Sequence, residues 1–385
     1  MDLVRCAICS FLKILGGRFV EPAAGIFMVL FFLLAGTAAG GTGPLPGGIP
    51  LHLRYATHFQ VEYLGNGCKL VTDGAGRRLL LVPRGQWPPK GYQQDQVIET
   101  PVERVVSKWT TIPPLLRALG VMNSIVGVTT RAKDWHIAGI RKGMAAGRIK
   151  YLGSSRATDY EQLLSVHPDV FFAGEWEKTE KLNELGIPFA VVTEYLEDNP
   201  LGRLEWIKFF AAFYNREREA ERFFAKAVSR INTLSGKLKA VGKRPNILWG
   251  FIAGQGRIYV PGGDSYVAGM ITMAGGAYVF KNIKKAGGAP ITLEEFYDRG
   301  RDADIYISSG MLPQYGITSI KKLVAVHPIL ADFRSVKRGN VWCFQPWYWE
   351  SIDKTDGIIA DLAAIMHPAL FPGHKPRYFF KLPKR

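Results

Sequence analysis

Residues 160–174, YEQLLSVHPDVFFAG, combine a short helical segment with a short apolar strand. The spacing of the apolar residues predicts a helix over 160–165, and the apolar run predicts a buried strand over 170–173. His167 stands between them directly before a proline, as do His327 and His367 elsewhere, and we interpret these three histidines as structural. A helix that leads into a buried strand is the repeating unit of an α/β fold.

The same alternation extends in both directions along the chain. Strands are predicted at 102–106, 125–128, 149–152, 170–173 and 189–192, with helices at 113–119, 160–165 and 182–185. It resumes with strands at 246–249, 305–308 and 341–344 and a helix at 266–273. Alternation of this kind predicts parallel strands with crossover helices. The fold class is therefore α/β, with an N-terminal lobe over 101–198 and a C-terminal lobe and tail over 241–385.

Residues 199–240 interrupt the rhythm and predict one long, rigid helix of about ten turns between the lobes. A stiff connector of this kind allows only small relative motions, so we expect a largely preformed cleft.

The composition is that of an ordinary globular protein, with 385 residues, 47% apolar and 21% charged residues, and a formal charge of +16. Residues 1–38 contain basic residues and then the apolar run 23–39, which predicts a cleaved secretory signal peptide and a periplasmic location. The alternative is an uncleaved membrane anchor. Export argues against nucleic acid as the partner of the basic chain.

Residues 39–100 predict a Gly/Pro linker followed by a small antiparallel β meander, with strands at 59–64, 68–72 and 77–83. No cysteine follows the apolar run, so no lipid-attachment cysteine is expected there. Cys68 and Cys343 lie in a compartment that permits disulfides, but we expect two buried, unpaired thiols.

Ligands of open α/β sheets bind beyond the carboxyl ends of the strands. Residues at these positions are often aromatic, which favours a small-molecule cleft over an ordinary surface. Serines and other polar residues accompany them: Ser155, Glu175, Glu194, Gln255, Ser265, Ser308 and Ser309. The candidate ligand-binding residues are Trp109, Arg131, Trp135, His136, Ser154, Arg156, Trp176, Tyr195, Phe251, Tyr259, Trp347, Tyr348 and Trp349.

Catalysis has little support in the sequence. No nucleophile elbow, metalloprotease helix, phosphate loop or paired-carboxylate spacing is present, and the seven histidines do not cluster at metal-ligand spacing. We therefore expect neither an enzyme nor a bound cofactor or metal centre. His136 remains open as a metal or anion contact, because it shares a loop with Arg131 and Trp135.

Two acidic positions, Glu161 and Glu295, each fall in a pattern typical of a helix-opening capping box, at 158–161 and 292–295. They either only cap their helices or also dock on a two-fold symmetric partner.

The chain resembles the periplasmic substrate-binding proteins of ABC importers that have a helical backbone and serve ferric siderophores, haem and cobalamin. The resemblance covers roughly 100–370 and leaves the meander outside. It implies a glutamate on each lobe that meets permease arginines, which falls on Glu161 and Glu295, with Glu294 as a neighbouring option. The motifs that carry it are ERVVS at 103–107, LLRALGV at 115–121, YEQLLSVHPDVFFAG at 160–174, DSYVAGMITMAGGAYVF at 264–280 and HPILADFRSVKRGNVWCF at 327–344.

The sequence and the resemblance together predict a monomeric receptor that captures a small metal chelate and delivers it to an ABC permease. Arg131 and Arg156 favour an anionic ligand, hence a ferric siderophore or haem over a corrinoid, with oxyanions such as molybdate less suited to so many aromatic residues. The alternatives are a sensor module that signals to a membrane partner and an exported metal chelatase.

Overall fold

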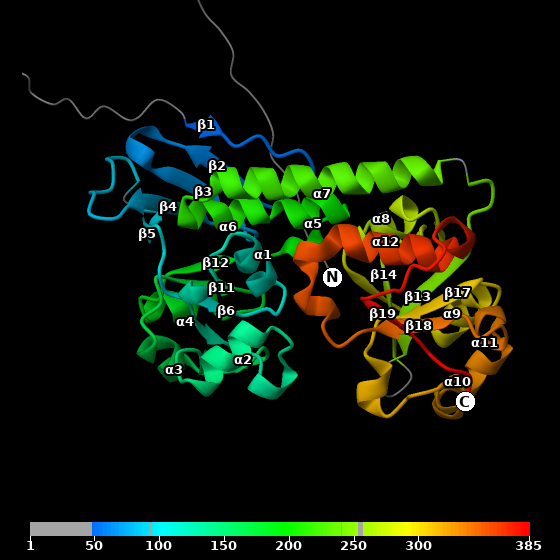
Figure 1. Cartoon of the computed structure of the whole chain (residues 1–385). Helices are drawn as coiled ribbons and strands as arrows, with labels where there is room; N and C mark the ends of the chain where they lie inside the picture. Colours follow the sequence, from blue (N-terminus) through cyan, green and yellow to red (C-terminus); the bar gives the residue numbers. More distant parts are fainter. Residues whose placement is uncertain (1–47, 93, 240, 253–256) are drawn as a thin grey trace, which may run out of the picture. The chain divides into compact units, whose positions relative to one another are not determined.

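The computed structural model describes residues 48–92, 94–239, 241–252 and 257–385 (Figure 1). The predicted signal peptide and the first part of the linker lie outside the described residues, as does the candidate residue Gln255. Within the described part of the chain, no helix is both long enough and apolar enough to cross a membrane.

The N-terminal lobe is built on a parallel sheet with the strand order β12-β11-β6-β7-β8. Every neighbouring pair in this sheet runs parallel, which confirms the prediction of strands joined by crossover connections. β6 and β11 lie in the middle, and both are fully buried. The strands are β6 (Val105–Ser107), β7 (Ile125–Val128), β8 (Lys150–Tyr151), β11 (Val170–Ala173) and β12 (Phe189–Val191); the helices are α1 (Ile112–Ala118), α2 (Ala138–Ala145), α3 (Tyr160–Ser165) and α4 (Thr179–Glu184).

The C-terminal lobe has a mixed sheet in the order β16-β14-β13-β17-β18-β19, with β15 also paired to β13. Its centre is parallel, whereas β14, β16 and β19 pair antiparallel at the two edges. The strands are β13 (Asn246–Ile252), β14 (Ile258–Pro261), β15 (Ala277–Tyr278), β16 (Gly288–Ile291), β17 (Ile305–Ser308), β18 (Val341–Phe344) and β19 (Phe379–Lys381). The helices are α8 (Tyr266–Met273), α9 (Leu293–Gly300), α10 (Ile320–Val326), α11 (Arg334–Lys337) and α12 (Thr355–Met366).

The connector between the lobes differs from the sequence prediction. The prediction of a single helix over 199–240 is wrong, because the segment forms three helices: α5 (Pro200–Glu205), α6 (Ile207–Tyr214) and α7 (Glu217–Leu238). Asn215 ends α6 in the left-handed conformation, with φ 55°, and the chain doubles back so that α7 lies along α6 (Figure 1). Asparagine is one of the few residues that adopt this conformation readily. α7, with 22 residues, spans about 33 Å and leads toward the C-terminal lobe.

α6 differs from a surface helix, because all eight of its residues are buried. An α-helix that is apolar on every side belongs inside a core. Its three phenylalanines pack edge to face with Phe172 of β11, at ring-centroid distances of 5.0–6.4 Å. α7 covers α6 on the side away from the N-terminal lobe's sheet (Figure 1).

A separate five-stranded sheet precedes the N-terminal lobe in the chain. It confirms the three predicted strands of the meander and contains two further strands, β1 and β5. Its order is β1-β2-β3-β4-β5, and the added strand β5 runs parallel to β4 rather than continuing the antiparallel meander. Hairpin turns identified β2, β3 and β4, but β5 follows a longer loop and offers no such signal. The strands are β1 (Ile49–Pro50), β2 (Gln60–Tyr63), β3 (Lys69–Thr72), β4 (Arg78–Pro83) and β5 (Gln96–Thr100).

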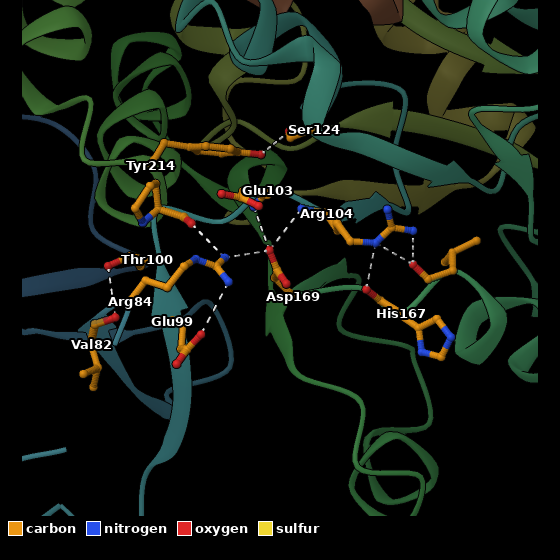
Figure 2. A network of polar contacts seen from close by, with 12 residues as sticks. Val82, Arg84, Glu99, Thr100, Glu103, Arg104, Ser124, His167, Asp169 and Tyr214 are labelled. Atoms are coloured by element: carbon orange, nitrogen blue, oxygen red, sulfur yellow. Dashed lines mark hydrogen bonds and ion pairs between the residues drawn. The ribbon is translucent and has the colours of Figure 1, made fainter. Parts of the chain in front are cut away.

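A polar network joins this sheet to the N-terminal lobe, as Figure 2 shows. Arg84, just after β4, reaches both Glu99 and Asp169, at 3.4 Å each. The Asp169 carboxylate also accepts hydrogen bonds from the backbone N–H groups of Glu103 and Arg104, at 2.7 and 3.1 Å. The start of β6 is therefore tied to both the sheet and the loop before β11.

Two fully buried carboxylates hold the segment that precedes β2. Glu205 of α5 accepts hydrogen bonds from the backbone N–H groups of Arg54, Tyr55 and Ala56, at 2.8–3.2 Å. Glu197 accepts from the N–H of Thr57 at 3.0 Å and from the indole N–H of Trp206 at 2.8 Å. The N-terminal segment is thus fastened directly to the connector helices.

The two described cysteines, Cys68 and Cys343, are both buried and unpaired, which confirms the prediction of free thiols. Burial raises the pKa of each thiol, that of Cys343 to about 11.

Candidate functional site

A cleft of about 590 Å³ lies where the carboxyl ends of the central strands of both lobes come together. The volume is in the range of small-molecule and cofactor sites. Seven of the candidate residues line it, all aromatic, and they come from both lobes: Trp109, Trp176, Tyr195, Phe251, Tyr259, Tyr348 and Trp349. Ser265, Ser309 and Glu194 lie on the same lining.

The wall from the N-terminal lobe follows β6, β11 and β12. Trp109 and Trp176 meet edge to face at a ring-centroid distance of 6.1 Å, and Trp176 lies 5.8 Å from Tyr195. A Cβ atom at Gly174 would lie 2.5 Å from the Trp109 ring, so the close approach of that ring requires glycine. Trp176 remains 71% exposed and can still cover a ligand.

Tyr195 is held at this wall by Glu175, whose carboxylate accepts a hydrogen bond from the phenol. Burial and this hydrogen bond raise the pKa of Tyr195, so the ring presents a neutral phenol at neutral pH. The polar end of the ring is directed to Glu175, which leaves its apolar face for the cleft.

Part of the wall from the C-terminal lobe comes from Phe344, Tyr348 and Trp349, beside Phe251 and Tyr259. Tyr348 stacks on Phe344 with ring centroids 3.8 Å apart and a 10° interplanar angle, and Trp349 meets Tyr348 edge-on at 5.2 Å. The three aromatics of QPWYW do not share one face. Trp347 points away from the cleft, and its indole N–H donates to the Arg377 carbonyl oxygen at 3.0 Å.

Five further candidates also lie outside the cleft lining, so the structure does not bring them together with the other seven. Trp135 is buried in the core, and its indole N–H donates to the Thr130 carbonyl oxygen at 3.0 Å. The loops that carry these residues follow β7 and β8, which lie on the side of β6 away from β12, so strand order rather than chain order decides which loops reach the cleft. The five are Arg131, Trp135, His136, Ser154 and Arg156.

His136 contacts a carboxylate instead of the cavity. Glu350 accepts hydrogen bonds from the backbone N–H groups of His136 and Ile137, at 2.9 and 2.7 Å, and its Oε1 lies 3.0 Å from the Nδ1 atom of His136. The contact therefore joins the two lobes. Across the described ranges, no group of three or more His, Cys, Asp or Glu side chains is arranged to hold a metal ion.

The sequence reasoning missed Arg203 of α5, because it searched only the strand ends. Its guanidinium lies 3.5 Å from the Glu194 carboxylate and 4.3 Å from the centre of the Tyr266 ring, and both charged side chains are buried. A lone arginine beside a glutamate within a largely apolar segment was the available signal.

A second buried network lies behind the tryptophan wall. Glu177 accepts hydrogen bonds from the Lys108 ammonium, from the Tyr160 phenol at 2.6 Å and from the Thr158 hydroxyl at 3.0 Å. Burial raises the pKa of Glu177, but these hydrogen bonds outweigh it and leave the pKa lowered. Because Lys108 precedes Trp109 and Glu177 follows Trp176, the network fixes both ends of this wall.

The two candidate docking residues lie in first helical turns, at 158–161 and 292–295. Thr292 caps α9 as expected and accepts from the Glu295 N–H at 3.1 Å, whereas Asp159 rather than Thr158 caps α3. Glu161 is exposed, and Glu295 contacts Arg299 at 3.1 Å.

Comparisons with known proteins extend this picture. A family model described as a periplasmic binding protein matches residues 105–346. An uncharacterized lipoprotein of Methanocaldococcus jannaschii is 33% identical over 329 residues, which cover 81% of this chain and 78% of that protein.

Solved structures show the same fold. The periplasmic haem-binding protein RhuT from Roseiflexus sp. RS-1 has a TM-score of 0.55 and 19% identity, over 70% of this chain and 99% of that chain. The molybdate-binding protein MolA of Haemophilus influenzae has a TM-score of 0.60 and 16% identity, over 78% and 92%. At these identities the likeness concerns the fold alone, and the two proteins bind different ligands, haem and molybdate.

The family match begins at β6 and ends beside the aromatic wall, so it includes the parallel sheet of the N-terminal lobe, the connector and the C-terminal sheet up to β18, but neither β19 nor the sheet β1–β5. The prediction of two α/β lobes is thereby confirmed. The proteins of this family are solute receptors of transport systems rather than enzymes. From the match over more than half of its length and the 33% identical relative, the chain belongs to the periplasmic binding protein family.

Proposed function

We propose that this protein is an extracytoplasmic receptor that captures a metal chelate or a corrinoid and delivers it to an ABC permease. The observation that carries this proposal is the cleft of about 590 Å³ with ten aromatic residues on its walls. Burial of about 200 Å² of apolar ligand surface on such walls contributes roughly 5 kcal/mol before the costs of association. Ferric siderophores, haem and corrinoids offer surface of this kind.

A small oxyanion fits the cleft less well. A hydrated anion such as molybdate gains its binding energy from hydrogen bonds and charge, whereas this lining is mainly aromatic. The sequence-based expectation of an anionic chelate depends on Arg131 and Arg156, and both arginines lie off the cleft lining. The choice among the large chelates therefore rests on the groups that do line the cleft.

The proposal is tested by tryptophan fluorescence of residues 39–385, titrated with haem, ferric siderophores, cobalamin and molybdate. Saturable quenching at micromolar or lower concentration by one compound, lost in Trp349→Ala, supports the proposal. Trp347→Ala is the matched control, because Trp347 is the neighbouring indole that points away from the cleft. A flat response from the folded protein across the whole panel would refute this ligand class.

Delivery to a permease is a separate part of the proposal. Glu161 and Glu295 would meet permease arginines, as the resemblance implies, and the exposed Glu294 is the alternative on α9. A Glu161→Ala/Glu295→Ala double variant should bind ligand normally but lose uptake. Unchanged uptake would rule out this docking assignment, and binding without any permease-dependent uptake would favour a sensor.

Export by a cleaved signal peptide, a periplasmic location and a monomeric state complete the proposal. Mass spectrometry of the N-terminus of the protein recovered from its native host tests the cleavage near residue 38. Sedimentation of the purified protein tests the monomer.

A further inference from the structure

The described lining of the cleft contains one charged spot among its aromatic residues. Arg203 and Glu194 are the two charged side chains on the described lining, and they are 7% and 2% exposed. Their closest approach is 3.5 Å, from Nη2 of Arg203 to Oε1 of Glu194. The spot therefore combines a cation and an anion in a desolvated position.

Neither charged group is saturated with hydrogen bonds. Nε of Arg203 and Oε2 of Glu194 are both buried and lack a hydrogen-bond partner among the described residues. A guanidinium has five N–H donors, and a carboxylate has two acceptor oxygens. Buried polar atoms in native proteins are nearly always paired, so atoms left unpaired beside a cavity point to a ligand or water that completes them.

The neighbouring phenols add donors but no charge. Tyr266 lies under the Arg203 guanidinium, and Tyr348 lies on the same lining. Burial raises the pKa of both tyrosines, so both remain protonated at neutral pH. The described residues of the lining carry no net charge, although the chain carries +16.

This balance of charge decides which ligand group fits. A ligand carboxylate would find Arg203 already paired and would leave a net negative charge in a low-dielectric site next to Glu194, which is costly. A neutral group that both donates and accepts satisfies both partners, because its N–H or O–H meets Glu194 and its carbonyl meets Arg203. A primary carboxamide has this combination of atoms.

We infer that Arg203 and Glu194 form a subsite for a neutral donor–acceptor group of the carboxamide kind, and that the cleft discriminates against ligands with carboxylates there. The inference rests on the proposed receptor function and specifies its ligand class. The receptor thus selects chelates with amide groups at their periphery over those with carboxylates.

The test uses two corrins with the same ring and metal. Dicyanocobinamide carries carboxamides at the positions where dicyanocobyrinic acid carries carboxylates. Residues 39–385 should bind the amide form at least about tenfold more tightly, by calorimetry at fixed ionic strength. Glu194→Gln should reduce this preference at least about tenfold, since it removes the charge but keeps a carbonyl acceptor. Glu180→Gln, an exposed glutamate on α4, is the control and should leave the preference unchanged.

The outcomes separate the inference from the proposed function. Equal or tighter binding of the carboxylate corrin, or of haem, overturns the inference and leaves the receptor function standing. A preference for the amide that persists in Glu194→Gln overturns the role of Glu194. Failure of the wild-type protein to bind either corrin, haem or any ferric siderophore overturns both. The wild-type comparison needs no variant, so it holds even if Glu194→Gln fails to fold.

Discussion

Substitution of Glu205 by glutamine should loosen the N-terminal segment from the rest of the protein. The Oε2 atom of Glu205 accepts from the N–H groups of Tyr55 and Ala56 at 2.8 and 3.0 Å, and Oε1 contacts the Lys208 ammonium at 3.0 Å. Both oxygens therefore face donors. A glutamine has one carbonyl oxygen and one NH₂ group, so in either orientation its NH₂ group faces donors and one set of contacts is lost.

The expected cost follows from the number and kind of contacts. A hydrogen bond to a charged group contributes about 1.5–3 kcal/mol, and a broken buried ion pair costs about 3–5 kcal/mol. Lys208 keeps its second partner, Glu221, at 2.8 Å, which reduces the loss. We expect the free energy of unfolding to fall by about 3 kcal/mol, or a urea midpoint lower by about 1 M for a slope near 3 kcal/mol/M.

The matched control is Glu221→Gln, which removes the exposed partner of the same lysine. The carboxylate of Glu221 is solvated and Lys208 keeps its contact with Glu205, so this variant should lose about 1 kcal/mol or less and unfold closer to the wild type than Glu205→Gln. Urea unfolding followed by fluorescence gives the two midpoints, and hydrogen exchange of the amides of 54–56 reports the local loosening. Equal midpoints for the two variants, with those amides still protected, would refute the reasoning.

Three other changes have expected outcomes. Trp176→Ala should weaken binding of the ligand found in the fluorescence panel about thirtyfold, or about 2 kcal/mol, because the ring is exposed toward the cleft; calorimetry measures this, and a change below twofold contradicts it. Cys68 and Cys343 should not react with Ellman's reagent at pH 8 until the protein unfolds, because burial limits access and raises the pKa of both thiols; rapid native labelling contradicts this. The pKa of Glu177 is lower in the folded protein than the unfolded value of about 4.3, so the ionised carboxylate stabilises the fold above that pH, and this stability is lost as the pH falls through the folded pKa. Glu177→Gln should therefore be less stable than the wild type at pH 7, and the difference should shrink near pH 3 in urea melts. A difference in stability that does not change with pH contradicts the prediction.

The sequence predicted the two α/β lobes because their strands are short apolar runs with clear boundaries. It also placed polar and aromatic residues at the strand ends, and seven of the thirteen candidate ligand-binding residues line one cleft. It could not predict the order of the strands, which depends on contacts between distant segments. Arg131 and Arg156 follow β7 and β8 in the chain, as the residues of the cleft follow their own strands, but β7 and β8 lie on the side of β6 away from β11 and β12, and both arginines lie off the lining.

The prediction of a single connector helix over 199–240 was wrong for a different reason. Apolar periodicity continues across Asn215, since α6 and α7 are both helices, and a reversal of direction requires only one residue in the left-handed conformation. Periodicity alone does not detect such a break. Arg203 could not be found at the strand ends, because it lies within the helix α5.

The stretch 345–353, QPWYWESID, shows how the cleft is kept open at a fixed width. Tyr348 and Trp349 form the aromatic wall, and the next carboxylates, Glu350 and Asp353, reach across to the N-terminal lobe. Glu350 accepts from the backbone around His136, and Asp353 accepts from the Arg117 guanidinium at 2.8 and 3.1 Å. Any wide opening of the lobes would break these bonds, at about 1.5–3 kcal/mol each. The ligand must therefore enter a cleft whose walls are already in place, and the rigidity comes from these carboxylates as well as from the helices.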